Sequence, residues 1–162
     1  MKALSGVLAA AWLVFSGSPG FAGTVNGKVD YPEGYRQWAH IKSMLLEPGH
    51  PLENPFQGLH HVYGNDKAMK GLEGGKFSDG SVLVFDLLNY NQGGHAIQEG
   101  DRKLVGVMKK DSKAFAATGG WGFEGFAGDS KTDRLVGDGG AGCYACHTSQ
   151  KEHDFVFTRP RK

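Results

Sequence analysis

Cysteine is scarce in this chain of 162 residues, and its two copies lie close together near the C-terminus. Thiol chemistry is therefore confined to one short segment. Long apolar runs are also missing beyond the N-terminal residues, so we expect no membrane insertion. Neither sign of charge is in excess, since the chain has 18 basic and 17 acidic side chains. The short basic end at residues 159–162 is typical of a solvated tail, and nucleic acid is not expected as a partner.

The N-terminal residues show the pattern of a secretory signal peptide. Lys2 supplies a positive charge, an apolar stretch follows up to Phe15, and small residues end at Ala22. The apolar stretch is too short to span a bilayer, and a small residue precedes the expected cleavage after Ala22. We therefore expect residues 1–22 to be removed on export. Residues 23–162 would then form a single domain in the periplasm.

Glycine is frequent, with 26 residues. Each glycine inside a helix costs about 1 kcal/mol relative to alanine, which argues against a bundle of long helices. Strand patterns instead recur along the chain, at residues 58–63, 81–88, 104–109 and 121–127. The polar residues 89–103 are expected to form a connection between two of these strands.

Three short helices are expected in addition to the strands. The first would begin near Asp30 and end before Pro48. Its apolar positions share one helical face: Gly34, Trp38, Ile41 and Leu45. Two shorter helices are expected at residues 65–72 and after Asp111. The predicted fold class is therefore α+β, with an antiparallel β-sheet and a few short helices.

The two cysteines belong to residues 143–147, which read Cys-Tyr-Ala-Cys-His. This is C-x-x-C-H, the attachment signal of a c-type haem. Cys143 and Cys146 can each add to one vinyl group of a porphyrin, and His147 can then give the iron its proximal nitrogen. A thioredoxin-like dithiol would want a βαβ context, and a zinc site recruiting His153 would need thiols that stay reduced after export. The sequence thus predicts one covalently attached haem c, with His147 as its iron ligand.

The position of the motif disfavours two common c-type architectures. Small electron-carrying cytochromes have the motif near the N-terminus and a methionine downstream that closes the sixth coordination site, but no methionine follows His147. The four-helix cytochromes c′ carry the motif near the C-terminus, yet their long amphipathic helices are not expected here. The upstream methionines are expected to fill the core: Met44, Met69 and Met108.

The sequence resembles the cytochrome P-460 family, and within it the branch called cytochrome c′-beta. The segments that carry the resemblance cover most of residues 23–162 in the same order. They are Tyr31-Pro32-x-x-Tyr35-Arg36-x-Trp38, Pro55-Phe56, Val62-Tyr63, Phe77-x-Asp79-Gly80-Ser81-Val82-x-Val84, Lys110-Asp111-Ser112-Lys113-x-Phe115-Ala116, Trp121-x-Phe123, the C-x-x-C-H motif, and Asp154-Phe155-Val156-Phe157-Thr158. The resemblance also implies a homodimer.

One position departs from the hydroxylamine-oxidising members of that family. Those enzymes use a lysine, on the strand after Asp-Gly, to cross-link the porphyrin. That place falls on Phe85, which has no nitrogen, so no cross-link is expected there. Three other lysines lie off the position and are expected to be solvated: Lys76, Lys109 and Lys110. Phe85 and Phe56 match instead the aromatic cap over the distal haem face in cytochrome c′-beta, although both could be ordinary core residues.

An apolar cap implies a five-coordinate iron with an open, apolar sixth site. Nitric oxide and carbon monoxide bind ferrous haem without needing a hydrogen bond, whereas bound dioxygen is helped by a distal donor. We therefore expect a periplasmic mono-haem cytochrome that binds these two gases, with nitric oxide capture or detoxification as its role.

Two alternatives stay open. A redox enzyme that oxidises hydroxylamine or nitric oxide would want a polar distal group to move protons, and His60 is the candidate. His60 and His61 point to opposite faces of their expected strand, so at most one faces the interior. A simple electron-transfer cytochrome, with a redox partner protein, would want a second strong iron ligand.

Overall fold

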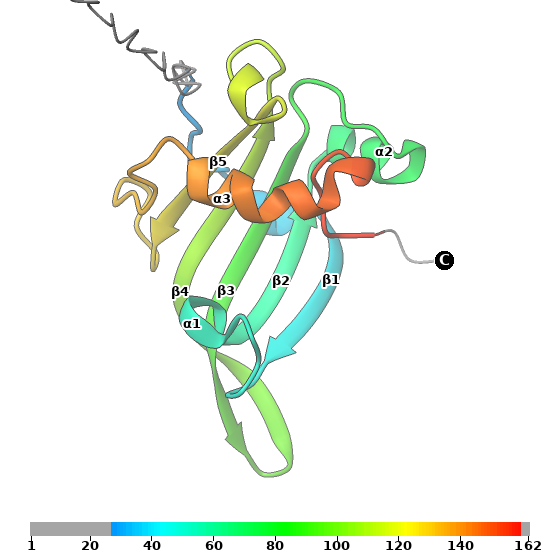
Figure 1. Cartoon of the computed structure of the whole chain (residues 1–162). Helices are drawn as coiled ribbons and strands as arrows, with labels where there is room; N and C mark the ends of the chain where they lie inside the picture. The colour runs from blue at the N-terminus through cyan, green and yellow to red at the C-terminus, as the bar shows by residue number, and fades with distance from the viewer. Residues whose placement is uncertain (1–26, 160–162) are drawn as a thin grey trace, which may run out of the picture.

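The computed structural model describes residues 27–159, so the expected signal peptide lies outside the described residues. Its centre is one five-stranded sheet in which each strand pairs antiparallel with the next along the chain (Figure 1). The strands are β1 (Ala39–Leu46), β2 (Gly58–Gly64), β3 (Val82–Gly93), β4 (Ala96–Lys110) and β5 (Trp121–Ala127). The predicted α+β class with an antiparallel sheet is confirmed.

Short helical segments occupy the connections and the C-terminal region. Figure 1 shows α3 crossing the strands on one face of the sheet, with α1 on the same side towards the opposite end. The segments are η1 (Tyr35–Gln37), α1 (Glu53–Phe56), α2 (Asp66–Gly74), η2 (Ala116–Thr118), α3 (Ala141–His147) and η3 (Thr148–His153). No helix within residues 27–159 is long and apolar enough to cross a bilayer.

Each face of the sheet carries its own apolar cluster. The cluster beneath α3 contains Leu83, Trp121 and Phe123, and Cys143 packs against it. The cluster on the other face contains Val84, Val105, Val107 and Phe126, covered by N-terminal residues that include Tyr35 and the partly buried Trp38. Strand residues alternate between the two clusters because successive side chains of a strand point to opposite faces.

The helix expected between Asp30 and Pro48 is wrong. Only η1 is helical there, and the residues after it form β1, which pairs with β2 along its length. A β-bulge between His40 and Lys42 shifts the register of this pair. The buried positions of β1 therefore do not alternate strictly, and their spacing resembled a helical face.

The connection expected at residues 89–103 is also wrong. Both strands continue through it as a hairpin that projects beyond the rest of the sheet (Figure 1). Its turn is made by Gly94 and His95, whose φ angles of 56° and 61° are typical of a tight hairpin turn. Residues 91–99 are exposed throughout, so the hairpin lacks the apolar alternation by which a half-buried strand is recognised.

The helix expected at residues 65–72 is confirmed as α2. The side-chain oxygen of Asn65 accepts the backbone N–H of Ala68 at 2.9 Å, as an N-cap residue does, and also that of Val82 at 3.1 Å. One side chain thus fixes both the start of α2 and the start of β3.

Candidate haem site

The C-x-x-C-H motif forms α3, which a carboxylate holds at its start. Asp138 accepts the backbone N–H groups of Gly140 at 2.9 Å and Gly142 at 2.8 Å, and these hydrogen bonds hold the pKa of Asp138 below its usual value. Cys143 and Cys146 lie one helical turn apart, and both are free thiols. Cys143 packs against the cluster beneath α3, whereas Cys146 is exposed. Because they are three residues apart in α3, the two thiols lie on the same side of this short helix.

His147 is oriented by a backbone carbonyl. Its Nδ1 lies 2.7 Å from the carbonyl oxygen of Phe155. A carbonyl can only accept, so Nδ1 carries the proton and Nε2 keeps its lone pair. Burial lowers the pKa of His147, which favours the neutral imidazole that binds metals. The rings of Phe123 and Phe157 flank it at centroid distances of 5.0 and 4.9 Å.

Phe56 and Phe85 lie close together on the same face of the sheet. Phe85 lies on β3 between Leu83 and Leu87, which share its face. Phe56 is the last residue of α1, a single turn within the expected loop, and is 36% exposed. Their ring centroids are 5.9 Å apart in an edge-to-face arrangement. The structure thus brings together the two predicted cap residues, and their role as a cap stays a prediction.

The backbone around Phe56 is fastened by two side chains from the sheet. His60 on β2 donates from Nε2 to the carbonyl oxygen of Phe56 at 2.5 Å. Lys103 on β4 donates to the carbonyl oxygens of Pro55 at 3.2 Å and Gln57 at 2.6 Å. His60 and Lys103 therefore hold three consecutive backbone carbonyls, those of Pro55, Phe56 and Gln57. Sequence reasoning missed Lys103, because a lysine in an expected polar connection gives no sign of a structural role.

His60 also contacts Phe85 directly. The side chain is 2% exposed, and its ring centroid lies 4.6 Å from that of Phe85. Burial lowers the pKa of His60, so the imidazole is neutral near pH 7. Its Nδ1 is buried and has no hydrogen-bond partner among the described residues. His60 therefore ties the two phenylalanines together and keeps one free acceptor.

Towards β4 and β5, the neighbours of Phe85 in the sheet are glycines. Phe85 pairs with Gly106 on β4, and Gly106 pairs with Gly125 on β5, so all three lie in one row on the same face. A Cβ on Gly106 would lie 3.1 Å from the ring of Phe85. Apolar side chains cover this row, since the ring of Phe85 lies over Gly106 and a Cβ on Gly125 would lie 3.3 Å from Leu135. This apolar surface, the free Nε2 of His147 and the thiols of α3 are groups that could hold a haem.

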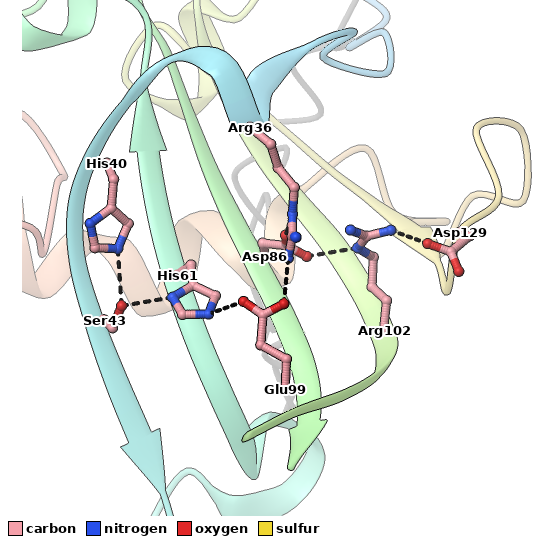
Figure 2. A network of polar contacts seen from close by, with 8 residues as sticks. All are labelled: Arg36, His40, Ser43, His61, Asp86, Glu99, Arg102 and Asp129. Atoms are coloured by element: carbon pink, nitrogen blue, oxygen red, sulfur yellow. Dashed lines mark hydrogen bonds and ion pairs between the residues drawn. The ribbon is translucent and has the colours of Figure 1, made fainter. Parts of the chain in front are cut away.

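The opposite face carries a network of charged side chains, which Figure 2 shows. Asp86 is fully buried and accepts from Nε of Arg36 at 2.9 Å and Nε of Arg102 at 2.8 Å. Burial alone would raise the pKa of Asp86, but the hydrogen bonds from Arg102 and Arg36 lower it. Arg102 also contacts Asp129.

His61 joins this network, as its position on β2 predicts. Its Nδ1 lies 2.7 Å from Oγ of Ser43, and its Nε2 lies 2.8 Å from a carboxylate oxygen of Glu99 (Figure 2). His60 and His61 therefore do point to opposite faces. The charged network is separated from the candidate haem site by the thickness of the sheet.

Two expectations for individual side chains are wrong. Lys110 is not solvated but 8% exposed, and its Nζ lies 2.6 Å from Oδ1 of Asp154. Met44 is 46% exposed and does not fill the core, unlike Ile41 and Leu46 on the same strand. Met69 and Met108 do pack against the cluster beneath α3.

The fold and the site together define a haem-binding domain built on an antiparallel sheet. The family model for Cytochrome P460 matches residues 32–158, so the chain belongs to the Cytochrome P460 family. Membership of this family implies a haem cofactor. A search of curated proteins found no match.

Proposed function

We propose that this protein is a periplasmic mono-haem c-type cytochrome of the cytochrome c′-beta branch, which binds nitric oxide and carbon monoxide at an apolar site. The observation that carries the proposal is the contact between Phe56 and Phe85, 5.9 Å apart and on the same face of the sheet as the C-x-x-C-H helix. A phenylalanine occupies the place where the hydroxylamine-oxidising relatives carry their cross-linking lysine. Capture or detoxification of nitric oxide is the role that this site serves.

The proximal side would be formed by α3. The thiols of Cys143 and Cys146 would each add across one vinyl group, with the sulfur bonding one carbon and the proton going to the other. His147 would bind the iron through Nε2, since its Nδ1–H is committed to Phe155. A haem held in this way supplies an iron atom with one open coordination position.

The distal side would discriminate ligands by polarity. The rings of Phe56 and Phe85 exclude water and donate no hydrogen bond. His60 does not donate either, because its single N–H is already used by the carbonyl of Phe56. Bound dioxygen gains from a distal donor, whereas nitric oxide and carbon monoxide do not need one. The site therefore favours these two gases.

One observation favours a second candidate, oxidation of hydroxylamine. Nδ1 of His60 is a buried acceptor without a partner among the described residues, and a general base needs such an atom. Its lowered pKa argues against this role, because a weaker base takes up a proton less readily. Gas binding is therefore the better supported function.

Anaerobic measurements with the purified protein distinguish the two candidates. We expect the reduced protein to bind one equivalent of nitric oxide and one of carbon monoxide per haem, with no turnover of hydroxylamine in the presence of an electron acceptor. Sustained hydroxylamine oxidation that is lost in His60→Leu would overturn gas binding as the main role. Intact mass before and after acid–acetone extraction tests covalent attachment, because a haem bonded to both cysteines stays with the chain.

The homodimer implied by the resemblance is part of the same proposal. Light scattering after size-exclusion chromatography tests it directly: a mass of one chain plus one haem would exclude the dimer. A redox partner protein would be needed only if the iron cycles between oxidation states.

A further inference from the structure

The carbonyl that binds His147 belongs to an unusual stretch of backbone. Asp154 and Phe155 follow η3 directly, and both have positive φ angles, 52° and 63°. Two consecutive non-glycine residues rarely adopt this left-handed conformation, least of all a bulky phenylalanine. Such a conformation persists only where the surrounding structure holds it.

Asp154 is held by three residues, each of which lies at least 33 positions earlier in the chain. Its Oδ1 lies 2.6 Å from Nζ of Lys110, at the end of β4, and its Oδ2 accepts the backbone N–H of Phe77 at 3.0 Å. Its main-chain oxygen accepts Nε1 of Trp121, at the start of β5, at 2.8 Å. Trp121 is fully buried, so the residue before Phe155 is anchored to the interior of the protein.

Lys110 is itself fixed on several sides. Besides Asp154, its Nζ donates to the carbonyl oxygen of Gly119 at 3.2 Å and lies 4.9 Å from the ring centroid of Trp121. A Cβ on Gly119 would lie 2.5 Å from the ring of Phe155, so this glycine provides the space in which that ring packs. Asp154 and the ring of Phe155 therefore both pack against the end of the sheet.

We propose that Asp154, held by Lys110, is a positioning residue for the proximal ligand: it fixes the carbonyl of Phe155 against Nδ1 of His147. The proposal rests on the proposed function in one respect, that His147 binds the haem iron. A carbonyl held in this place strengthens the hydrogen bond from Nδ1–H and makes the imidazole a better electron donor. A better donor stabilises the ferric iron and lowers the midpoint potential.

Three variants separate the elements of this anchor. Asp154→Gly tolerates the positive φ but removes the carboxylate. Asp154→Asn keeps an acceptor for Phe77 and tolerates the same backbone, but loses the charge that pairs with Lys110. Lys110→Met removes the cation and keeps the length of the side chain.

Two matched controls lie nearby. Asp79→Asn changes another aspartate at the same end of the sheet, which accepts the backbone N–H and the hydroxyl of Ser112 at 2.9 and 2.8 Å. Lys109→Met changes the lysine next to Lys110 on β4, whose side chain points to the other face.

Two quantities are measured. The first is the rate at which the His147 Nδ1 proton exchanges with deuterium, which NMR of the ferric holoprotein records. The second is the midpoint potential of the haem. In Asp154→Gly and Lys110→Met we expect exchange at least about fivefold faster, the factor that corresponds to loss of one ordinary hydrogen bond, and a higher potential. Asp154→Asn should fall between these variants and the wild type. Both controls should match the wild type.

Folded Asp154→Gly and Lys110→Met proteins with exchange within about twofold of the wild type and an unchanged potential would overturn the proposal. If Asp154→Gly does not fold, the other two variants decide the matter. Lys110→Met keeps the length of the side chain, and Asp154→Asn keeps an acceptor for the backbone N–H of Phe77. The result is independent of gas binding, because the proton of an iron-bound histidine is observable in either spin state of ferric haem. A wild type that binds no gas would overturn the proposed function and leave this inference standing.

Discussion

Nε2 of His60 donates to the carbonyl oxygen of Phe56 at 2.5 Å, while the same imidazole packs edge-on against Phe85. One buried side chain thus fixes the backbone that carries one phenylalanine and the ring of the other. His60, the candidate for a polar distal group if the protein were a redox enzyme, supports the aromatic pair in the structure. This relationship makes the proposed distal role of the two phenylalanines testable.

Replacing His60 should loosen the aromatic pair. In His60→Ala the carbonyl of Phe56 loses its donor and a cavity opens beside Phe85, so we expect the free energy of unfolding to fall by about 2 kcal/mol. Carbon monoxide should then associate severalfold faster, as measured by flash photolysis. His61→Ala, on the other face, serves as the control and should leave the association rate unchanged. Equal rates in His60→Ala and the wild type would show that His60 does not support the cap.

Lys103 should act on the same segment from the other side. Lys103→Met removes both donors to the carbonyls of Pro55 and Gln57 but keeps the volume of the side chain. We expect faster association of carbon monoxide, in the same direction as for His60→Ala, and a larger effect in the double variant. Lys70→Met, at an exposed position on α2, should have no effect. A rate for Lys103→Met equal to that of the control would contradict the role given to Lys103.

A basic side chain at position 85 should reach the haem. In Phe85→Lys we expect the amine to bind the iron and convert the spectrum of the reduced protein to a low-spin form. The affinity for carbon monoxide should fall by about tenfold or more, because the gas must compete with the amine. Asn91→Lys, on the exposed part of β3, should keep the wild-type spectrum. An unchanged spectrum in Phe85→Lys would place Phe85 away from the ring.

Asp86 should make stability depend on pH. Its pKa is lower in the folded protein than in the unfolded chain, so the unfolded chain binds more protons as the pH falls. The stabilisation is therefore present above the ordinary carboxyl pKa and is lost as the pH falls towards the folded value. At pH 7, Asp86→Asn should cost about 3–5 kcal/mol of unfolding free energy, because Arg36 and Arg102 lose a buried partner.

The difference between Asp86→Asn and the wild type should shrink as the pH falls from 5 towards 3, as followed by denaturant unfolding at a series of pH values. Asp129→Asn removes an exposed partner of Arg102 and should cost less than about 1 kcal/mol. A pH-independent difference for Asp86→Asn would contradict the ionised state of Asp86 in the fold.

Several parts of the structure could be predicted from local sequence. β5 was predicted with its observed bounds, and α2 with its cap, because Asn65 and the aromatic residues of β5 give strong local signals. β1 was not predicted, since a bulge changes the spacing of its buried residues. The hairpin that turns at Gly94 and His95 was not predicted, because the side chains on both faces of its two strands are exposed.

The site could be predicted only where a motif or a family resemblance named its residues. The C-x-x-C-H motif and the pair of Phe56 and Phe85 are of this kind, whereas the helix α3 that the motif forms was not predicted. Lys110 was expected to be solvated because its partner, Asp154, lies 44 residues further along the chain. Lys103 and the carbonyls it binds are likewise separated by more than 40 residues. Such contacts depend on the register of the sheet, which single-residue patterns do not contain.

The absorption spectrum of the dithionite-reduced protein, recorded before and after addition of carbon monoxide, tests the central claim most directly. An open, apolar site opposite His147 predicts a five-coordinate, high-spin c-type spectrum that converts completely to a low-spin form with the gas. A low-spin spectrum that carbon monoxide does not change would contradict it, because the sixth position would already be occupied by a strong ligand of the protein.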